Sequence, residues 1–176
     1  VAWMLLGKPD LSMILNGCLA GLVAVTAPCA FVTIASSAWI GLIGGVIVVF
    51  AVLAFDRIKI DDPVGALSVH LVNGIWGTLA LGLFYDNDVA TNGAALATGL
   101  SRGAQTLAQL KGILGVGIYA FGASLVFWYA IKAMMGVRVT AEEEIEGLDV
   151  GEHGISAYPD FATHSSRFGA SYGKGS

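Results

Sequence analysis

Three long stretches of this 176-residue chain contain no Asp, Glu, Lys or Arg. They cover residues 11–55, 63–85 and 112–131. A helix that crosses a bilayer needs roughly 20 predominantly apolar residues, because each residue rises about 1.5 Å. The apolar residues are continuous instead of alternating, which favours membrane-spanning helices over a β-barrel. The sequence therefore predicts an all-α integral membrane protein built as a multi-helix bundle.

The composition excludes an ordinary soluble domain. The chain is 56% hydrophobic and 12% charged, whereas a soluble domain carries about 25% charged residues. The net charge of −4 says little about partners, because the acidic residues cluster near the C-terminus. Cys18 and Cys29 do not make a disulfide framework, and neither they nor His153 and His164 have the spacing of a metal site. We predict no cofactor, no metal and no enzymatic activity.

Turn and cap signals divide the chain into four membrane-spanning helices. We expect them at about residues 11–27, 37–55, 63–84 and 107–135, with a long Ala, Gly, Asn and Thr-rich loop before the last. Residues 1–7 read as the last turns of another apolar helix, so we interpret the chain as the C-terminal part of a larger membrane protein. The predicted membrane domain is 1–136, and the tail is 137–176, disordered after about 161.

The positions of Lys and Arg predict the orientation. If the helices alternate, five basic residues lie on one side and two on the other, namely Lys8, Arg57, Lys59, Lys132 and Arg138 against Arg102 and Lys111. The side richer in Lys and Arg is the cytoplasmic one. This places the C-terminal tail in the cytoplasm and the bundle in the cell (inner) membrane.

Small residues recur at helical spacing in the expected spans. Gly17 and Gly21 form a GxxxG pair, and so do Gly41 and Gly45. In the third span Gly74 and Gly77 share a face. Small residues let helix backbones approach closely in lipid. The pattern predicts a compact bundle, with Gly74 and Gly77 as helix-packing residues.

His70 is the one ionisable residue of the third span apart from the terminal Tyr85. A titratable group in a membrane span is costly and by default marks a polar pathway or a proton-handling site. Ala66, Gly74 and Thr78 lie at multiples of four from His70 and so share its helical face. The alternative is a structural histidine bonded to a backbone carbonyl, to Ser68 or to Asn73.

Other polar residues of the spans have two readings each. Asn16 either lines the inner exit of a pore or bonds to a neighbouring helix. For Asn73 we expect an interhelical bond. Asp61 and Asp62 stand before Pro63, where they suit a helix cap and an ion pair with Arg57 or Lys59.

Three segments resemble the Amt/Mep/Rh family of ammonium transporters. The segment 61–77 has the acidic pair Asp61-Asp62, a histidine eight residues on, and glycines four and seven residues after it, as the family's tenth helix does. Residues 16–30 are similar to the family's eighth helix, and residues 138–158 to the start of its cytoplasmic tail. The resemblance implies an eleven-helix protomer, usually a trimer, with a pore through each subunit. This chain would supply the end of helix seven and helices eight to eleven.

The resemblance also implies a function. It predicts passage of ammonium or ammonia through a hydrophobic pore, with His70 as the second of two proton-relaying histidines. It implies that the tail docks a cytosolic PII-type signalling protein, and the candidate regulatory residues are Gly147, Leu148, Asp149, His153, Gly154 and Tyr158. The alternatives are an Rh-type gas or small-solute channel and an ammonium sensor built on the same fold.

Overall fold

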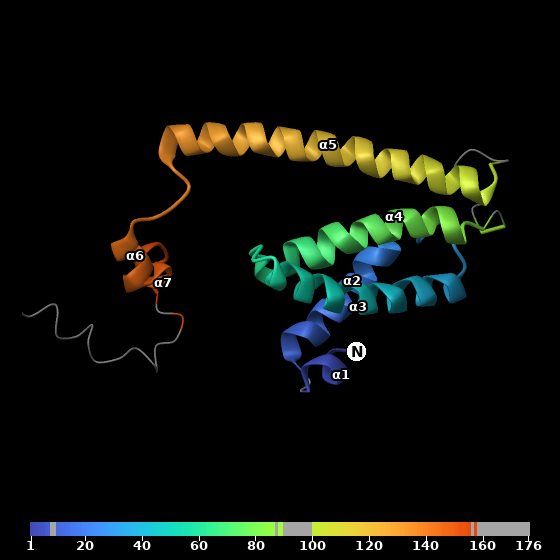
Figure 1. Ribbon diagram of the computed structural model, residues 1–176, viewed down its shortest axis with the longest axis horizontal. Helices are drawn as coiled ribbons and strands as arrows, with labels where there is room; N and C mark the ends of the chain where they lie inside the picture. The colour runs from blue at the N-terminus through green and yellow to red at the C-terminus, as the bar shows by residue number, and fades with distance from the viewer. Residues whose placement is uncertain (8–9, 87, 90–99, 156, 158–176) are drawn as a thin grey trace, which may run out of the picture. The chain divides into compact units, whose positions relative to one another are not determined.

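All the regular structure in the described part of the chain is helical. The computed structural model describes residues 1–7, 10–86, 88–89, 100–155 and 157. In chain order (Figure 1) the elements are α1 (Ala2–Leu6), α2 (Leu11–Thr26), α3 (Ile34–Arg57), the 3-10 turn η1 (Pro63–Gly65), the π-helix η2 (Ala66–Val72), α4 (Asn73–Phe84), α5 (Arg102–Met135), α6 (Ala141–Glu146) and α7 (Leu148–Gly151).

The chain forms two compact units, Val1–Gly122 and Ala123–Ser176, and the division falls inside α5. The sequence places a domain boundary later, after residue 136, where the charged tail begins. The predicted membrane domain and the compact units are therefore different divisions of the chain. The predicted disorder after residue 161 lies outside the described residues.

Short polar side chains begin the helices of the first unit, as the sequence predicts. The carboxylate of Asp10 accepts a hydrogen bond from the backbone N–H of Met13 at 2.8 Å and caps α2. Thr33 caps α3 in the same way through the N–H of Ser36 at 3.2 Å. Gly7 ends α1 with a φ of +70°, a conformation that glycine adopts without strain.

In the part of the chain that the structure describes, three helical segments are long and apolar enough to cross a membrane. They are Ile34–Arg57, Pro63–Phe84 and Arg102–Met135. The fourth predicted span, α2, is apolar but has 16 residues, which gives about 24 Å at 1.5 Å per residue. This is less than the hydrocarbon thickness of about 30 Å, so α2 does not make a full straight crossing by length.

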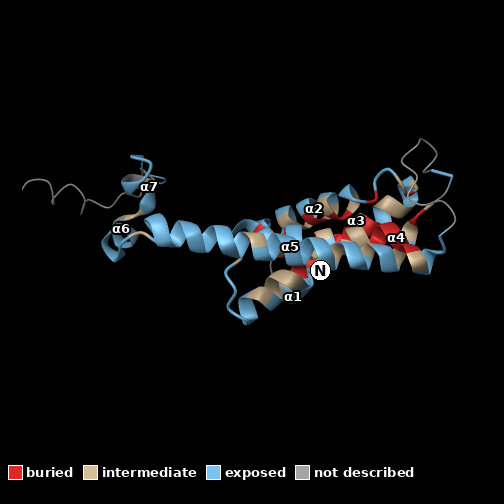
Figure 2. Cartoon of the chain, turned by 90° about the horizontal axis from the view of Figure 1, so that it is seen from above, coloured by how far each residue is buried: buried red, intermediate tan, exposed pale blue. Residues whose placement is uncertain are grey.

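The core of the first unit lies where α2, α3 and α4 meet (Figure 2). Its fully buried apolar side chains are small or β-branched, and they include Ala20 and Ala24 of α2, Ile40 and Val48 of α3, Val69 of η2 and Ala80 of α4. Most of α5 is exposed (Figure 2). A long apolar helix with an exposed surface is typical of a protein whose surroundings are lipid or further helices.

The two GxxxG pairs face each other across α2 and α3. A Cβ placed on Gly21 would lie 3.5 Å from the carbonyl oxygen of Gly41, and one on Gly45 would lie 3.7 Å from that of Gly17. Because Gly21 meets Gly41 and Gly17 meets Gly45, the two helices run antiparallel with their backbones in close approach. The predicted packing role of these glycines is confirmed.

The two glycines of the third span behave differently. A Cβ on Gly77 would overlap the carbonyl oxygen of Ala24, whereas a Cβ on Gly74 would have no neighbour within 4 Å. Gly77 therefore packs α4 against α2, as predicted. Gly74 makes no such contact with another helix within the described residues, and its predicted packing role stays a prediction.

The second unit contains the end of α5 and two short helices. Thr140 and Glu143 form a capping box at the start of α6, and the bonds from Thr140 lower the pKa of the Glu143 carboxyl. Arg138 pairs with Glu144 at 2.8 Å. Gly147 and Gly154 have φ values of +104° and +64°, which glycine adopts without strain.

Replacing Gly77 should loosen the first unit, whereas the same change at Gly74 should not. We expect Gly77→Ala to lower the free energy of unfolding by about 1–3 kcal/mol, because its methyl group overlaps the backbone of α2. Gly74→Ala is the matched control. Reversible unfolding of both variants in detergent micelles measures the difference. Equal stability of the two variants would show that the close contact at Gly77 is unimportant.

A candidate functional site around His70

The third apolar stretch is not one continuous α-helix. A 3-10 turn is followed by the seven-residue π-helix η2, which carries His70, and α4 begins at Asn73. Val64 in the first turn has a φ of +55°, an uncommon and strained conformation for a β-branched residue. π-helical turns are rare in proteins, and those that occur are often found at functional sites. The hydrophobic pattern of so short a segment does not distinguish it from an α-helix.

Asp62 organises the start of this stretch. Its carboxylate accepts hydrogen bonds from the backbone N–H groups of Leu67 and Ser68, the latter at 2.9 Å. Burial acts to raise the pKa of Asp62, but hydrogen bonds from residues 67 and 68 outweigh burial and lower it. Asp62 thus binds two backbone donors at the start of the π-helix, next to the position where the sequence predicts a cap.

The ion pair predicted for the acidic residues is absent. Among the described residues the one ion pair is Arg138–Glu144, and the side chain of Asp61 makes no hydrogen bond there. The carboxylate of Asp62 is directed to backbone donors of its own stretch. Arg57 and Lys59 are therefore not its partners.

Asn73 also differs from the prediction. It is completely buried, and its Nδ2 donates to the backbone carbonyl of Ser68 at 3.1 Å, within its own stretch. The interhelical bond comes instead from Trp76, whose indole Nε1 donates to the carbonyl of Ile40 at 3.1 Å. The Oδ1 atom of Asn73 is buried and has no hydrogen-bond partner among the described residues.

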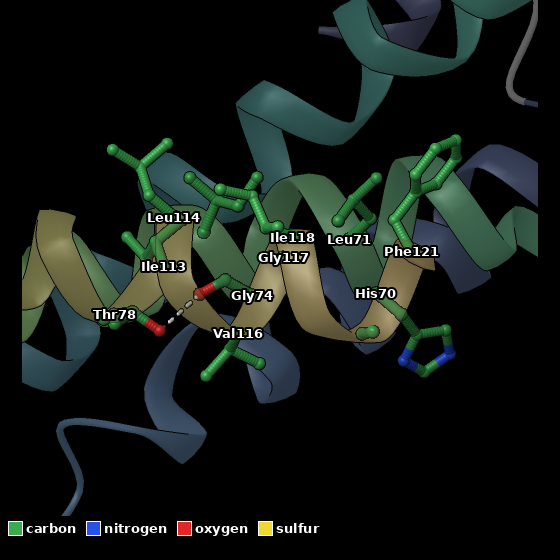
Figure 3. Close-up of a pocket in the computed structure, with 13 residues that line it drawn as sticks. His70, Leu71, Gly74, Thr78, Ile113, Leu114, Val116, Gly117, Ile118 and Phe121 are labelled. Atoms are coloured by element: carbon green, nitrogen blue, oxygen red, sulfur yellow. Dashed lines mark hydrogen bonds between the residues drawn. The ribbon is translucent and has the colours of Figure 1, made fainter. Parts of the chain in front are cut away.

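A cavity of about 730 Å³ lies between this stretch and α5. Figure 3 shows Thr78, Gly74 and His70 one after another along this stretch, with Gly74 between the other two. The hydroxyl of Thr78 donates to the carbonyl of Gly74 at 2.8 Å. The lining residues are His70, Leu71, Gly74, Ile75, Thr78, Gly112, Ile113, Leu114, Val116, Gly117, Ile118, Ala120 and Phe121. Of these thirteen, His70 is the one titratable residue.

The cavity opens because α4 and α5 touch closely at one end only. A Cβ on Gly82 would lie 2.6 Å from the Cα of Thr106, so the two backbones are in contact there. The guanidinium of Arg102 donates to the carbonyl of Leu83 at 3.0 Å and ties the start of α5 to the end of α4. Farther along, Gly74 and Gly117 have no atom near their missing side chains, which leaves space.

The structure brings some of the predicted residues together. His70, Gly74 and Thr78 line one cavity, as their spacing indicates. Ala66 is exposed, Asn16 is half-buried on α2, and neither lines this cavity. His70 is exposed and makes no hydrogen bond among the described residues, so the predicted alternative of a bonded structural histidine is not observed.

The sequence analysis did not identify the α5 side of the cavity. Ile113 and Phe121 are examples of lining residues that an apolar pattern alone does not single out. The available signal was the repeated glycine of the fourth span, at Gly112, Gly115 and Gly117.

The candidate regulatory residues lie in the second unit. The carboxylate of Asp149 accepts a hydrogen bond from the backbone N–H of Ala157 at 2.7 Å. The backbone carbonyl of Asp149 accepts one from the backbone N–H of Ile155 at 3.1 Å. A Cβ on Gly147 would lie 2.7 Å from Oδ1 of Asp149. Leu148 begins α7, and His153 and Gly154 are exposed after it. Tyr158 lies outside the described residues.

Fold and site together define a multi-pass helical membrane protein with a lone histidine in an apolar cavity. The sequence model of the Ammonium Transporter Family matches residues 1–158. This chain therefore belongs to the Ammonium Transporter Family.

Curated relatives agree with this assignment. The chain is 41% identical over 165 residues to the ammonium transporter Amt2 of Archaeoglobus fulgidus, covering 92% of this chain and 35% of the relative. It is 34% identical to an ammonium transporter of Bacillus subtilis, covering 91% and 40%. A solved structure titled Sensor Amt Protein matches with a TM-score of 0.76 and 35% identity, covering 86% and 36%. The chain thus spans little more than a third of these proteins.

The bonds of Asp62 predict a pH-dependent helix start. Because its folded-state pKa is below the ordinary value of 3.8, its stabilisation is present above that value and is lost as pH falls through the lowered pKa. Asp62→Asn should speed amide hydrogen exchange at Leu67 and Ser68 above that pH and abolish the acid-dependent change. Asp61→Asn is the control and should leave both amides unaffected. Identical exchange in the two variants would contradict the assignment.

Proposed function

We propose that this chain forms part of a pathway by which ammonium or ammonia crosses a membrane past His70. The observation that carries the proposal is the placement of one titratable side chain in a cavity otherwise lined by apolar residues, glycines and Thr78. Membership of the Ammonium Transporter Family and relatives named ammonium transporters support the same reading.

An apolar passage favours a cation that can lose its charge by giving up a proton, as ammonium can. Moving any cation from water into such a passage costs a large desolvation energy. Potassium keeps its charge and meets the full cost. Ammonium can transfer a proton to a neighbouring base and continue as neutral ammonia, so the same passage rejects potassium and admits the nitrogen.

The imidazole of His70 suits this transfer. A neutral imidazole has one nitrogen that accepts a hydrogen bond and one that donates, so it can take a proton on one side and release one on the other. Neither of its nitrogens is held by a bond within the described residues. The family resemblance implies a second histidine facing it.

Further parts of the proposal rest on the resemblance. The whole transporter would be a trimer of eleven-helix protomers, with Ala66 and Asn16 along the pathway beyond the cavity around His70. The excess of Lys and Arg on one side supports a bundle in the cell (inner) membrane with a cytoplasmic C-terminus.

The tail would connect transport to nitrogen supply through a cytosolic PII-type protein. Its described residues include exposed apolar side chains, Leu148 and Ile155, beside a fixed turn at Gly147. The bonds that Asp149 accepts from Ile155 and Ala157 hold the segment after α7. Such a surface supports docking of a partner, and Leu148, His153, Gly154 and Tyr158 are the further candidate contacts.

A sensor is the second candidate function. The solved structure titled Sensor Amt Protein supports it through its 35% identity and TM-score of 0.76. A sensor would bind ammonium with little net flux, whereas a transporter would show saturable or conductive flux. An Rh-type channel would differ in carrying electroneutral flux.

Removing the imidazole should impair the proposed pathway. In the whole transporter reconstituted in liposomes, His70→Ala should lower ammonium flux at least about tenfold, because proton transfer by a placed base contributes that much or more. Stopped-flow pH measurements and potassium-selective currents provide the readouts. Thr78→Val, which keeps the side-chain size in the same cavity, is the control. Unchanged flux together with unchanged selectivity in His70→Ala would contradict the role of His70.

The turn at Gly147 should be needed for regulation. Gly147→Ala forces an alanine to a φ of +104° and brings its methyl group against Asp149. We expect this variant to lose the change in flux that follows a shift in nitrogen supply, with the bundle still folded. Gly151→Ala is the matched control, because Gly151 lies in α7 with open space beside it. A normal response in Gly147→Ala would rule out the regulatory turn.

A further inference from the structure

Asn73 occupies the junction between the π-helix and α4, three residues after His70. Its side chain is completely buried, and its Nδ2 donates to the carbonyl of Ser68 at 3.1 Å. Its backbone N–H donates to the carbonyl of His70. One residue therefore holds two carbonyls of the segment that carries the imidazole, one with its side chain and one with its backbone.

The orientation of the Asn73 amide follows from chemistry. A carbonyl oxygen accepts hydrogen bonds only, so the NH₂ group must face Ser68 and Oδ1 must face the other way. A Cβ on Gly44 of α3 would lie 3.0 Å from this Oδ1. The absence of a side chain at Gly44 leaves the room that the amide occupies.

A buried amide with one unpartnered atom is a poor choice for packing alone. Burying a polar group without a full set of partners costs free energy, and an apolar side chain of the same size would avoid that cost. Asn73 is nevertheless completely buried, and its side chain lies beside Gly44 of α3. The polar atom that does have a partner, Nδ2, is the one that bonds to the segment carrying His70.

We propose that Asn73 is a positioning residue for His70. Its amide fixes the π turn by holding the Ser68 carbonyl, and the π turn in turn sets the direction of the exposed imidazole at the edge of the cavity (Figure 3). Without the amide donor, the segment returns to α-helical spacing. A change of register by one residue turns a side chain by about 100° around the helix axis, which moves the imidazole off its present face. The functional meaning of this placement rests on the proposed pathway, whereas the placement itself does not.

The test is an NMR measurement on this chain in lipid nanodiscs, with isotope labels on histidine and on the backbone. It does not measure transport. Nuclear Overhauser contacts of the His70 imidazole with the residues around it report its position. Amide exchange over residues 68–73 reports the turn. Asn73→Leu keeps the size and removes the donor. Asn73→Asp keeps the shape, and its carboxyl, when protonated, can donate to the Ser68 carbonyl in place of the amide.

We expect Asn73→Leu to lose the imidazole contacts and to exchange its amides about tenfold faster, as loss of one hydrogen bond predicts. Asn73→Asp should keep both at a pH where its carboxyl is protonated. Thr78→Val, which removes another side-chain bond to a carbonyl of α4, is the control and should change neither. Folded Asn73→Leu with unchanged imidazole contacts would overturn the proposal.

If Asn73→Leu does not fold, Asn73→Asp tests whether Asn73 positions His70. Its imidazole contacts should disappear when the introduced carboxyl ionises and return when it is protonated. Contacts that persist in both forms would overturn the proposal. Failure here would leave the proposed pathway intact, since that pathway is tested separately by the flux of His70→Ala.

Discussion

A helix in hydrocarbon must form hydrogen bonds to its own backbone polar groups, because no water is present to do so. The arrangement of the first unit depends on how the third apolar stretch forms these bonds. The stretch changes from a 3-10 turn to a π-helix and then to an α-helix. Each change leaves backbone groups without their usual partners. Asp62 supplies acceptors for two N–H groups at the start, and Asn73 supplies a donor for a carbonyl at the second junction. These two side chains bracket His70, which places a titratable group in an apolar region without a bond of its own.

Small residues then convert this local geometry into a cavity. Gly77 brings α4 into backbone contact with α2, and Gly82 brings it into contact with the start of α5. Toward His70, Gly74 has open space beside it, and there α4 and α5 separate around the cavity. The close approach to α5 at Gly82 and the gap at Gly74 both lie where side chains are missing.

The sequence was sufficient for much of this architecture, because the deciding signals are local. Charge-free stretches predicted the long spans, and the spacing of Gly17 and Gly21 predicted close helix packing. The spacing of Gly74 and Thr78 from His70 placed all three on one cavity. The π-helix was not predictable, since a few apolar residues are compatible with either helical type. Asn73 was assigned to the wrong partner, because its nearest acceptor exists only once the π turn has formed. The α5 lining depends on the angle between two helices, which spacing within one helix does not contain.

The central claim is that the His70 imidazole interacts with ammonium and not with potassium. Solid-state ¹⁵N NMR of the imidazole, in the proposed whole transporter reconstituted in lipid, tests this most directly. His153 in the tail, which is exposed, gives an internal reference in the same spectrum. We predict that added ammonium shifts the His70 nitrogen resonances, that equal potassium leaves them unchanged, and that His153 responds to neither. A His70 spectrum that is indifferent to ammonium, or that responds equally to both cations, would contradict the claim.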